Sequence, residues 1–455
     1  MLEKLFKLKE NKTDVKTEIL AGVTTFMTMA YILAVNPSIL GDAGMNPTAV
    51  LLATAIASFV GCACMAFMAN YPFALAPGMG LNAYFAYTVC IGMGVSWQTA
   101  LLAVFIEGIV FIVLSLTNVR EAIFNAIPLT LKTAVSAGIG LFIAFIGLQN
   151  AKIVVNSDAT LVTYQSFKTN FSTEGITALL AIIGVIVTAY LVIKKVKGDI
   201  FLGIVITWAL GMLCQAVGIY VPNPDAGFYS LFPNFSAGWN FGALGETVGA
   251  VFKADISEIG IANLIVVVFA FLFVDIFDTL GTLIGVATKA DMLDEEGKLP
   301  KIKGALMADA VATTSGAVLG TSTVTTFVES ASGVAAGGRT GLTAIVTGFL
   351  FLLSIVLSPL FLSIPSFATA PALIVVGFYM MCNVVKINFN DYIEAIPAYL
   401  TILFMPIMYS ISEGIVIGVI SYTVLVLVTG KAKEKKLSPL MYVLSILFIC
   451  KYIFL

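Results

Sequence analysis

The chain contains no histidine, and charged residues and cysteines are scarce. Its 455 residues include 24 lysines and arginines and 26 aspartates and glutamates, which gives a net charge of −2. Without a long acidic or basic block, we expect no nucleic-acid partner. Cys62 and Cys64 have a CxC spacing, but all six cysteines lie in or beside apolar segments. Since such thiols usually pack as small hydrophobic residues, we predict no metal site and no cofactor.

The remaining composition is strongly hydrophobic. Hydrophobic residues make up 59% of the chain and charged residues 11%, and the mean hydropathy is +1.02. Soluble domains carry about a quarter charged residues. Apolar stretches of roughly 17–25 residues recur throughout, each long enough to cross a membrane of about 30 Å as a helix. Because these runs are continuous rather than alternating, we predict an all-α polytopic protein in the lipid bilayer of the cell membrane.

The apolar stretches predict about fourteen membrane segments in two groups of seven. The first group covers residues 17–220 and the second covers 261–430. They are flanked by an arm at 1–16, a loop at 221–260 and a basic tail at 431–455. The expected spans are 17–36, 48–70, 74–92, 97–117, 132–149, 176–194, 200–220, 261–285, 304–319, 323–337, 340–362, 368–385, 392–410 and 413–430.

The basic residues predict the orientation of these spans. They concentrate before the first span and after even-numbered spans, as with Lys9, Arg120, Lys194, Lys298 and Arg339. Because cytoplasmic loops collect lysine and arginine, we expect both termini in the cytoplasm. Residues 438–454 could form an interfacial helix or an additional span, and the basic stretch before them favours the interface.

The two groups also resemble each other weakly. TAVSAGIGLFIAFIG at 133–147 is similar to TAPALIVVGFYMMCN at 369–383, and GDIFLGIVIT at 198–207 to EGIVIGVISY at 413–422. With seven segments per group, the second group would enter the membrane from the opposite side. Inverted repeats of this kind are typical of secondary transporters.

Two corresponding segments, 71–89 and 319–338, are poorly suited to continuous helices. The first contains APGMG before Asn82, and the second contains TSTVTT before Glu329. Irregular backbone at membrane depth is stable only where protein covers it or where it lines a cavity. The half-helices that follow would turn unpaired N–H groups toward a ligand, so we predict the transport site here. Alternatively, small residues such as Gly333, Gly337 and Gly338 only permit close helix packing.

Five acids lie deep in the predicted spans, where a charge costs roughly 2.5–3.5 kcal/mol. Asp275 and Asp278 are three residues apart and share a helical face, so one of the pair would tend to bind a proton. The sequence TLGTLIG after Asp278 favours Asp278 as the ligand and Asp275 as a packing or hydrogen-bonding group. For Glu107 we expect an interhelical hydrogen bond, and for Asp309 a structural or gating role.

The central segments contain no histidine and no evident lysine or arginine. Proton coupling would therefore fall to Glu329 and Asp278. Carboxylates accept hydrogen bonds from ring N–H groups, while amides and backbone N–H groups donate to carbonyls and ring nitrogens. This chemistry suits a neutral, planar solute rich in hydrogen-bonding groups.

Four motifs closely resemble the purine permeases of the adenine/guanine/hypoxanthine branch of the nucleobase–ascorbate transporter superfamily. They are TEILAGVTTFMTMAYILAVNP, APGMGLNAYFAYTV, VDIFDTLGTLIGVA and GTSTVTTFVESASGVAAGGRTGLTA. The resemblance implies core segments at 17–117 and 261–362, gate segments at 132–220 and 368–430, and a homodimer. Short strands in segments 3 and 10 would lie at the substrate site.

The resemblance also implies roles for individual residues. The substrate-binding acids of the family fall on Asp278 and Glu329, and the asparagine of segment 3 falls on Asn82. Around them we expect substrate contacts from Gly78, Gly80, Phe327, Val328 and Ser330. A histidine that uracil carriers have one turn beyond the segment-8 acid is replaced here by Thr282, so their proton-relay detail does not transfer.

These observations together predict a symporter, and not an enzyme, that imports hypoxanthine, guanine or adenine with protons. The core would move against the gate to alternate access. An anion carrier or exchanger of the same architecture is the main alternative, and a passive nucleobase channel is less favoured. An intramembrane enzyme would need Asp275 and Asp278 as a carboxylate dyad, which we consider the weakest hypothesis.

Overall fold

The computed structural model describes residues 2–116, 128–167, 170–224, 227–233, 240–289, 292, 299–435 and 437–454. Ten helices of the described chain are long and apolar enough to cross a bilayer. The helices Ile302–Leu319 and Tyr392–Ile407 and two broken segments complete the fourteen predicted segments, so the all-α membrane fold is confirmed. Arg120 and Lys298, which contributed to the predicted orientation, lie outside the described residues.

Two helices of the first half begin at polar residues that satisfy a free N–H group. Asp14 accepts a hydrogen bond from the backbone N–H of Thr17, and Asn46 accepts one from that of Thr48, with Pro47 at the first helical position. The elements of this half are α1 (Leu2–Phe6), α2 (Val15–Met29), α3 (Ile32–Asp42), α4 (Pro47–Met68), β1 (Leu75–Pro77), α5 (Met79–Ala83), η1 (Tyr84–Gly92), α6 (Trp97–Leu116), α8 (Leu129–Asn150), β2 (Val154–Ser157), β3 (Leu161–Tyr164), α9 (Ile176–Ile193) and α10 (Asp199–Ala216).

The second half repeats this order after a loop with short helical turns. Thr340, Asp391 and Ser410 cap the helices that follow them. The elements are α11 (Leu244–Thr247), α12 (Ile261–Lys289), α13 (Ile302–Leu319), β4 (Val324–Thr326), α14 (Ser330–Ala335), α15 (Gly341–Leu353), α16 (Ser358–Leu362), α17 (Ser366–Met381), η8 (Cys382–Lys386), α18 (Tyr392–Ile407), α19 (Ile411–Val428) and α20 (Pro439–Phe454).

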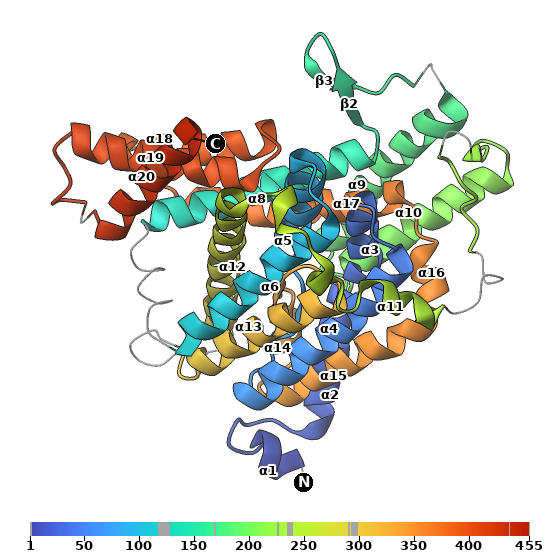
Figure 1. The fold of residues 1–455 in the computed structure, drawn as a ribbon. Coiled ribbons are helices and arrows are strands. Elements are labelled where there is room, and N and C mark those ends of the chain that lie inside the picture. Colours follow the sequence, from blue (N-terminus) through green and yellow to red (C-terminus); the bar gives the residue numbers. More distant parts are fainter. Residues whose placement is uncertain are drawn as a thin grey trace.

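The helices pack into two groups, and each group takes members from both halves of the chain (Figure 1). In one group α4 packs against α13 and α15, α2 against α15, and α6 against α13. In the other group α8 packs against α17 and α18, α9 against α10 and α17, and α18 against α19. The N-terminus and the β2–β3 hairpin lie at opposite ends of the molecule (Figure 1).

The centre of the second group is a crossing of α8 and α17 at two glycines. A methyl group on Gly140 would lie 2.5 Å from the carbonyl oxygen of Gly377, and one on Gly377 would overlap the carbonyl oxygen of Gly140. Neither position therefore tolerates a side chain, and the two backbones are in contact. The two similar sequences lie on α8 (133–147) and on α17 with the first two residues of η8 (369–383).

Helix α20 lies lengthwise along α19. Ser445 Oγ is 2.8 Å from Thr423 Oγ1, and nearer the C-terminus Tyr452 is hydrogen-bonded to Glu413, so the two helices are antiparallel. The interfacial helix predicted for residues 438–454, and its alternative of an additional span, both stay predictions.

Candidate functional site

The two broken segments meet in a short antiparallel pair of strands, β1 and β4. Leu75 is opposite Thr326, and Pro77 is opposite Val324. Beyond the strands, the N–H of Gly78 donates to the Thr323 carbonyl at 3.0 Å, and the N–H of Phe327 donates to the Ala74 carbonyl at 3.0 Å. These bonds satisfy irregular backbone inside the protein, as burial at membrane depth demands.

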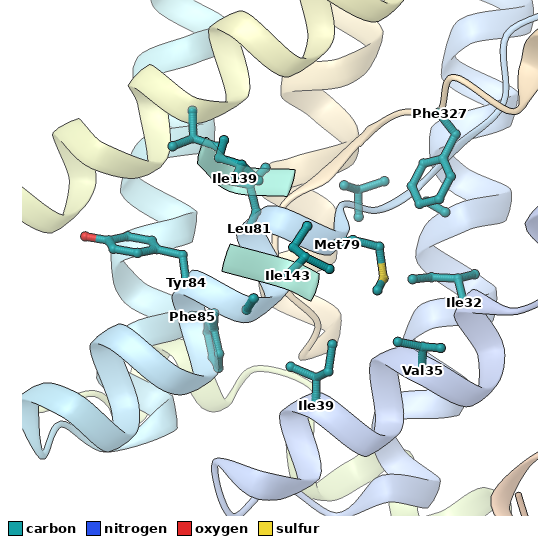
Figure 2. Packing of buried hydrophobic residues seen from close by; sticks show 14 of the residues in the cluster. Ile32, Val35, Ile39, Met79, Leu81, Tyr84, Phe85, Ile139, Ile143 and Phe327 are labelled. Carbon is teal, nitrogen blue, oxygen red and sulfur yellow. The ribbon is translucent and has the colours of Figure 1, made fainter. Parts of the chain in front are cut away.

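Two glycines beside β1 permit close approach. A methyl group on Gly78 would lie 2.6 Å from Thr325 Cγ2, and one on Gly80 would lie 2.8 Å from Ile139 Cγ2. Gly78 thus allows the chain after β1 to lie close against β4, and Gly80 allows α5 to reach α8. Figure 2 shows Met79 between these two glycines, packed among apolar side chains of α3 and α8.

The glycines after Glu329 have a different role. A methyl group on Gly333 would lie 2.9 Å from the carbonyl oxygen of Ala21 on α2, and one on Gly338 would lie 2.9 Å from Ala21 Cβ. These contacts match the packing alternative for Gly333 and Gly338.

A cavity of about 500 Å³ lies between the two groups of helices. One wall comes from the junction of α2 and α3, the β1–α5 turn, α12 and the β4–α14 turn. The opposite wall comes from α8, α17 and η8. Its volume is in the range of small-molecule binding sites.

Asp278 and Glu329 both line this cavity, and each is half-buried. They are close enough for their charges to interact. The hydroxyl of Tyr31 donates a hydrogen bond of 2.8 Å to Glu329 Oε1 and also lines the cavity. Sequence reasoning missed Tyr31. The feature that could have identified it is its hydroxyl group, which lies within the first apolar span.

The other predicted ligands divide into two sets. Gly78, Gly80, Thr282, Phe327 and Val328 line the cavity, and the side chain of Val328 is 53% exposed there.

Asn82 and Ser330 are completely buried and do not belong to the cavity wall. Asn82 Oδ1 accepts a hydrogen bond from Ser322, and Ser330 Oγ accepts one from the Ala74 N–H at 2.9 Å. In this conformation both residues join the two broken segments, and their contact with substrate remains a prediction.

Glu107, Asp275 and Asp309 lie behind the cavity wall and are completely buried. Thr279 Oγ1 is 2.9 Å from Asp275 Oδ1 and 3.0 Å from Asp309 Oδ2. Thr323, which precedes β4, donates to Glu107 Oε2 at 3.1 Å. Asp275 and Asp278 are thus one turn apart, but only Asp278 reaches the cavity.

The expectation that no basic residue lies at the site is wrong. Lys132 on α8 and Lys386 on η8 both line the cavity. Helix α8 begins at Leu129, three residues before the predicted start of this span, and the cavity extends to this end of the helix. Lys386 Nζ donates to Asn383 Oδ1 at 2.9 Å, and Asn383 Nδ2 donates to Ser136 Oγ at 3.1 Å.

The two groups of helices are in direct contact at the other end of α8. Tyr87 donates a hydrogen bond of 2.7 Å to Asp42 Oδ2, and Asn150 Nδ2 donates to the Tyr87 hydroxyl at 3.1 Å. Thr88 Oγ1 also donates to the Tyr409 carbonyl at 3.1 Å. These bonds join η1 and α3 to α8 and the turn before α19, so the cavity is closed at this end.

Comparison with known proteins gives consistent matches over the whole chain. A family model described as the Permease family matches residues 16–417. A putative permease of Methanocaldococcus jannaschii is 48% identical, with 100% of this chain and 98% of the relative covered. The guanine/hypoxanthine permease PbuG of Bacillus subtilis is 45% identical, with both chains fully covered, and the adenine permease AdeP of Escherichia coli is 41% identical, with 100% and 96% covered.

Solved structures with the same fold are more distant in sequence. The transmembrane domain of the cyanobacterial bicarbonate transporter BicA has a TM-score of 0.58 at 14% identity, covering 89% of this chain and 97% of that one. The murine anion transporter Slc26a9 in the inward-facing state has a TM-score of 0.63 at 11% identity, covering 91% and 68%. At these identities the likeness establishes the fold alone.

Proposed function

Because the chain belongs to the purine permease branch of the nucleobase–ascorbate transporter superfamily, we propose that it is a secondary transporter of purine nucleobases in the cell membrane. The observation that carries this proposal is the pair of carboxyl groups, Asp278 and Glu329, lining one cavity beside the half-helix segments. The names of the relatives supply the substrate class.

The geometry suits a planar base with N–H groups on its edge. Tyr31 donates to Glu329 Oε1, which leaves Oε2 to accept from the substrate. Asp278 offers a second acceptor on the same wall, and Phe327 and Val328 offer apolar surface. An analogue that lacks a ring N–H would leave one of these carboxylates without a hydrogen-bond donor, so the site should bind that analogue more weakly.

Transport proceeds by movement of the helix group that holds β1 and β4 against the group built on α8 and α17. In the predicted orientation, with the termini in the cytoplasm, the cavity opens inward and the bonds of Tyr87 close the outer end. Glu329 and Asp278 carry the coupling proton as well as the base. Asn82 and Ser330 support the substrate contacts of the half-helices, and the homodimer implied by the resemblance completes the assembly.

The decisive experiment is uptake of labelled hypoxanthine by cells or vesicles that contain the full chain. We expect saturable uptake that adenine or guanine competes for and that a proton uncoupler abolishes. Competition by uracil alone would contradict the purine class. Uptake that neither saturates nor responds to purines would indicate a channel. Inhibition by bicarbonate or chloride would support the anion-carrier alternative, for which Lys132 and Lys386 offer positive charge but which Asp278 and Glu329 disfavour.

A further inference from the structure

Three carboxyl groups meet in the interior behind the substrate cavity. Glu107 comes from α6, Asp275 from α12 and Asp309 from α13, and all three side chains are completely buried. A buried carboxylate is costly unless it is paired, and like charges close together increase that cost. The hydrogen bonds of this cluster show how many of the three groups are neutral.

Thr279 is the first constraint, because its hydroxyl has three oxygen partners and one proton. Oγ1 lies 2.9 Å from Asp275 Oδ1, 3.0 Å from Asp309 Oδ2 and 2.7 Å from Thr325 Oγ1. A hydroxyl donates one hydrogen bond and accepts two. The hydroxyl of Thr325 can donate to Thr279 Oγ1, and the hydroxyl of Thr279 can then donate to only one of the two carboxyl groups. The other carboxyl group must itself donate, so it is a protonated acid.

Glu107 is the second constraint. Its carboxyl group is completely buried and lies near that of Asp275, so an ionised Glu107 would face a second acid in the interior. Thr323 donates to Glu107 Oε2, whereas Oε1 has no hydrogen-bond donor among the described residues. Because a buried carboxylate with a single hydroxyl donor is costly, Glu107 carries a proton of its own. This proton is additional to the one that Asp275 or Asp309 donates to Thr279.

We propose that Glu107, Asp275 and Asp309 form a proton-binding site, separate from the substrate cavity, that holds two protons among its three carboxyl groups. The ligand is a proton rather than a metal ion, because Thr279 Oγ1 is in direct hydrogen-bonding contact, at 2.7–3.0 Å, with its three oxygen partners. In the described chain no group of three acidic, cysteine or histidine residues is arranged to hold a metal. The nearest further titratable group on α12 is Asp278.

The position of these protons connects the site to the cavity wall. The bonds of the cluster join α6, α12 and α13 to Thr323 and Thr325, and the same segment continues to Phe327 and Glu329 in the cavity wall. Protonation thus stabilises the packing of three helices around β4. If the protons were removed, three carboxylates would repel each other, and this packing would be weakened.

Infrared difference spectroscopy on the purified full chain without substrate tests this proposal. At neutral pH, subtracting the Glu107→Gln spectrum from that of the unmodified protein should reveal the carbonyl band of one protonated carboxylic acid. The carboxylate bands should be unchanged, because a neutral amide replaces a neutral acid. Asp309→Asn should give the same result. Loss of carboxylate bands without loss of the acid band would overturn the proposal.

Glu10→Gln is the matched control, because Glu10 is exposed and pairs with Lys7. This substitution should remove carboxylate bands only. If the cluster variants do not fold, the double variant Asp278→Asn/Glu329→Gln keeps the cluster and removes both cavity acids. Its spectrum must still contain the acid band at neutral pH, and absence of the band would refute the site. Because no transport is measured, this result is independent of the proposed substrate.

Discussion

Asp275 and Asp278 are separated by one turn of α12, but their surroundings are opposite. Asp278 lines the cavity beside Glu329, where a ligand can reach it. Asp275 is enclosed by Glu107, Thr279 and the residues around them, where only a proton fits. Both are acids in an apolar helix, so neither residue type nor depth explains the difference. The difference comes from the neighbouring elements, because one face of α12 borders the cavity and the opposite face lies against α6 and α13.

This comparison separates two ways to keep a carboxyl group inside a membrane protein. A group in a cavity can remain charged because solvent or substrate stabilises it, and it is then available for binding. A group in a closed cluster is satisfied by hydroxyl groups and by protons, and it then contributes to stability. Substitutions of cavity acids should therefore impair uptake, whereas substitutions in the cluster should impair stability.

The largest effect on uptake is expected for Glu329→Gln. Hydrogen bonds to a charged group contribute about 1.5–3 kcal/mol, so the initial rate of labelled hypoxanthine uptake should fall about tenfold or more. Glu10→Gln should leave uptake unchanged. Rates that stay at the level of the unmodified protein, at matched expression, would remove Glu329 from the binding site.

The largest effect on stability is expected for Thr279→Val. Valine keeps the shape of threonine but leaves the carboxyl groups of Asp275 and Asp309 without their shared partner. We expect a loss of about 1–3 kcal/mol in the free energy of unfolding. Thermal unfolding in detergent measures this loss, and Thr279→Ser should restore most of it. Equal melting temperatures for Thr279→Val and Glu329→Gln would erase the distinction between the two regions.

An intermediate effect is expected for Tyr31→Phe, which removes the hydrogen bond to Glu329 but leaves the carboxyl group in place. A typical hydrogen bond contributes about 1 kcal/mol, which corresponds to about a fivefold weaker apparent affinity for hypoxanthine. Tyr164→Phe on the exposed β2–β3 hairpin is the control. A weakening as large as that of Glu329→Gln would mean that Tyr31 contacts the base directly.

The smallest effect is expected at the surface acids, which serve as a baseline for both regions. Lys435 bonds to Asp391 and, at 2.7 Å, to Glu394. Its ammonium group lowers the pKa of Asp391 below the ordinary 3.8. The stabilisation is therefore present above that pH and is lost as the pH falls below it.

Lys435→Met should accordingly cost at most about 1 kcal/mol at neutral pH and nothing in strong acid. Melting temperatures at both pH values, with and without high salt, measure this difference. A cost that persists in strong acid would show that packing of the lysine side chain, and not its charge, stabilises α18.

The sequence predicted the fold well because long apolar runs, prolines and glycines act locally. Pro77 and Gly78 indicated the break in segment 3, and the run TSTVTT indicated the break in segment 10. Asp278 and Glu329 could be chosen as cavity residues because each follows or precedes a stretch of small and hydroxyl-bearing residues.

Long-range pairing could not be predicted in the same way. Nothing near Asn82 in the chain shows that Ser322 occupies its side-chain oxygen, and nothing near Glu107 shows that Asp275 lies against it. Lys132 stands at the predicted start of its span and away from the central segments, whereas α8 starts a turn earlier and the cavity extends to this end of the helix.

The crossing of α8 and α17 has a consequence for how this half of the molecule can move. The peptide groups at Gly140 and Gly377 are in direct contact, so no side chains lie between the two helices there that could change rotamer to let the helices approach. The two helices can rotate about their crossing point, but the distance between their axes cannot decrease. This distance is set by main-chain atoms, so exchange of the surrounding aliphatic residues should not change it, and α8 and α17 should move as one rigid unit.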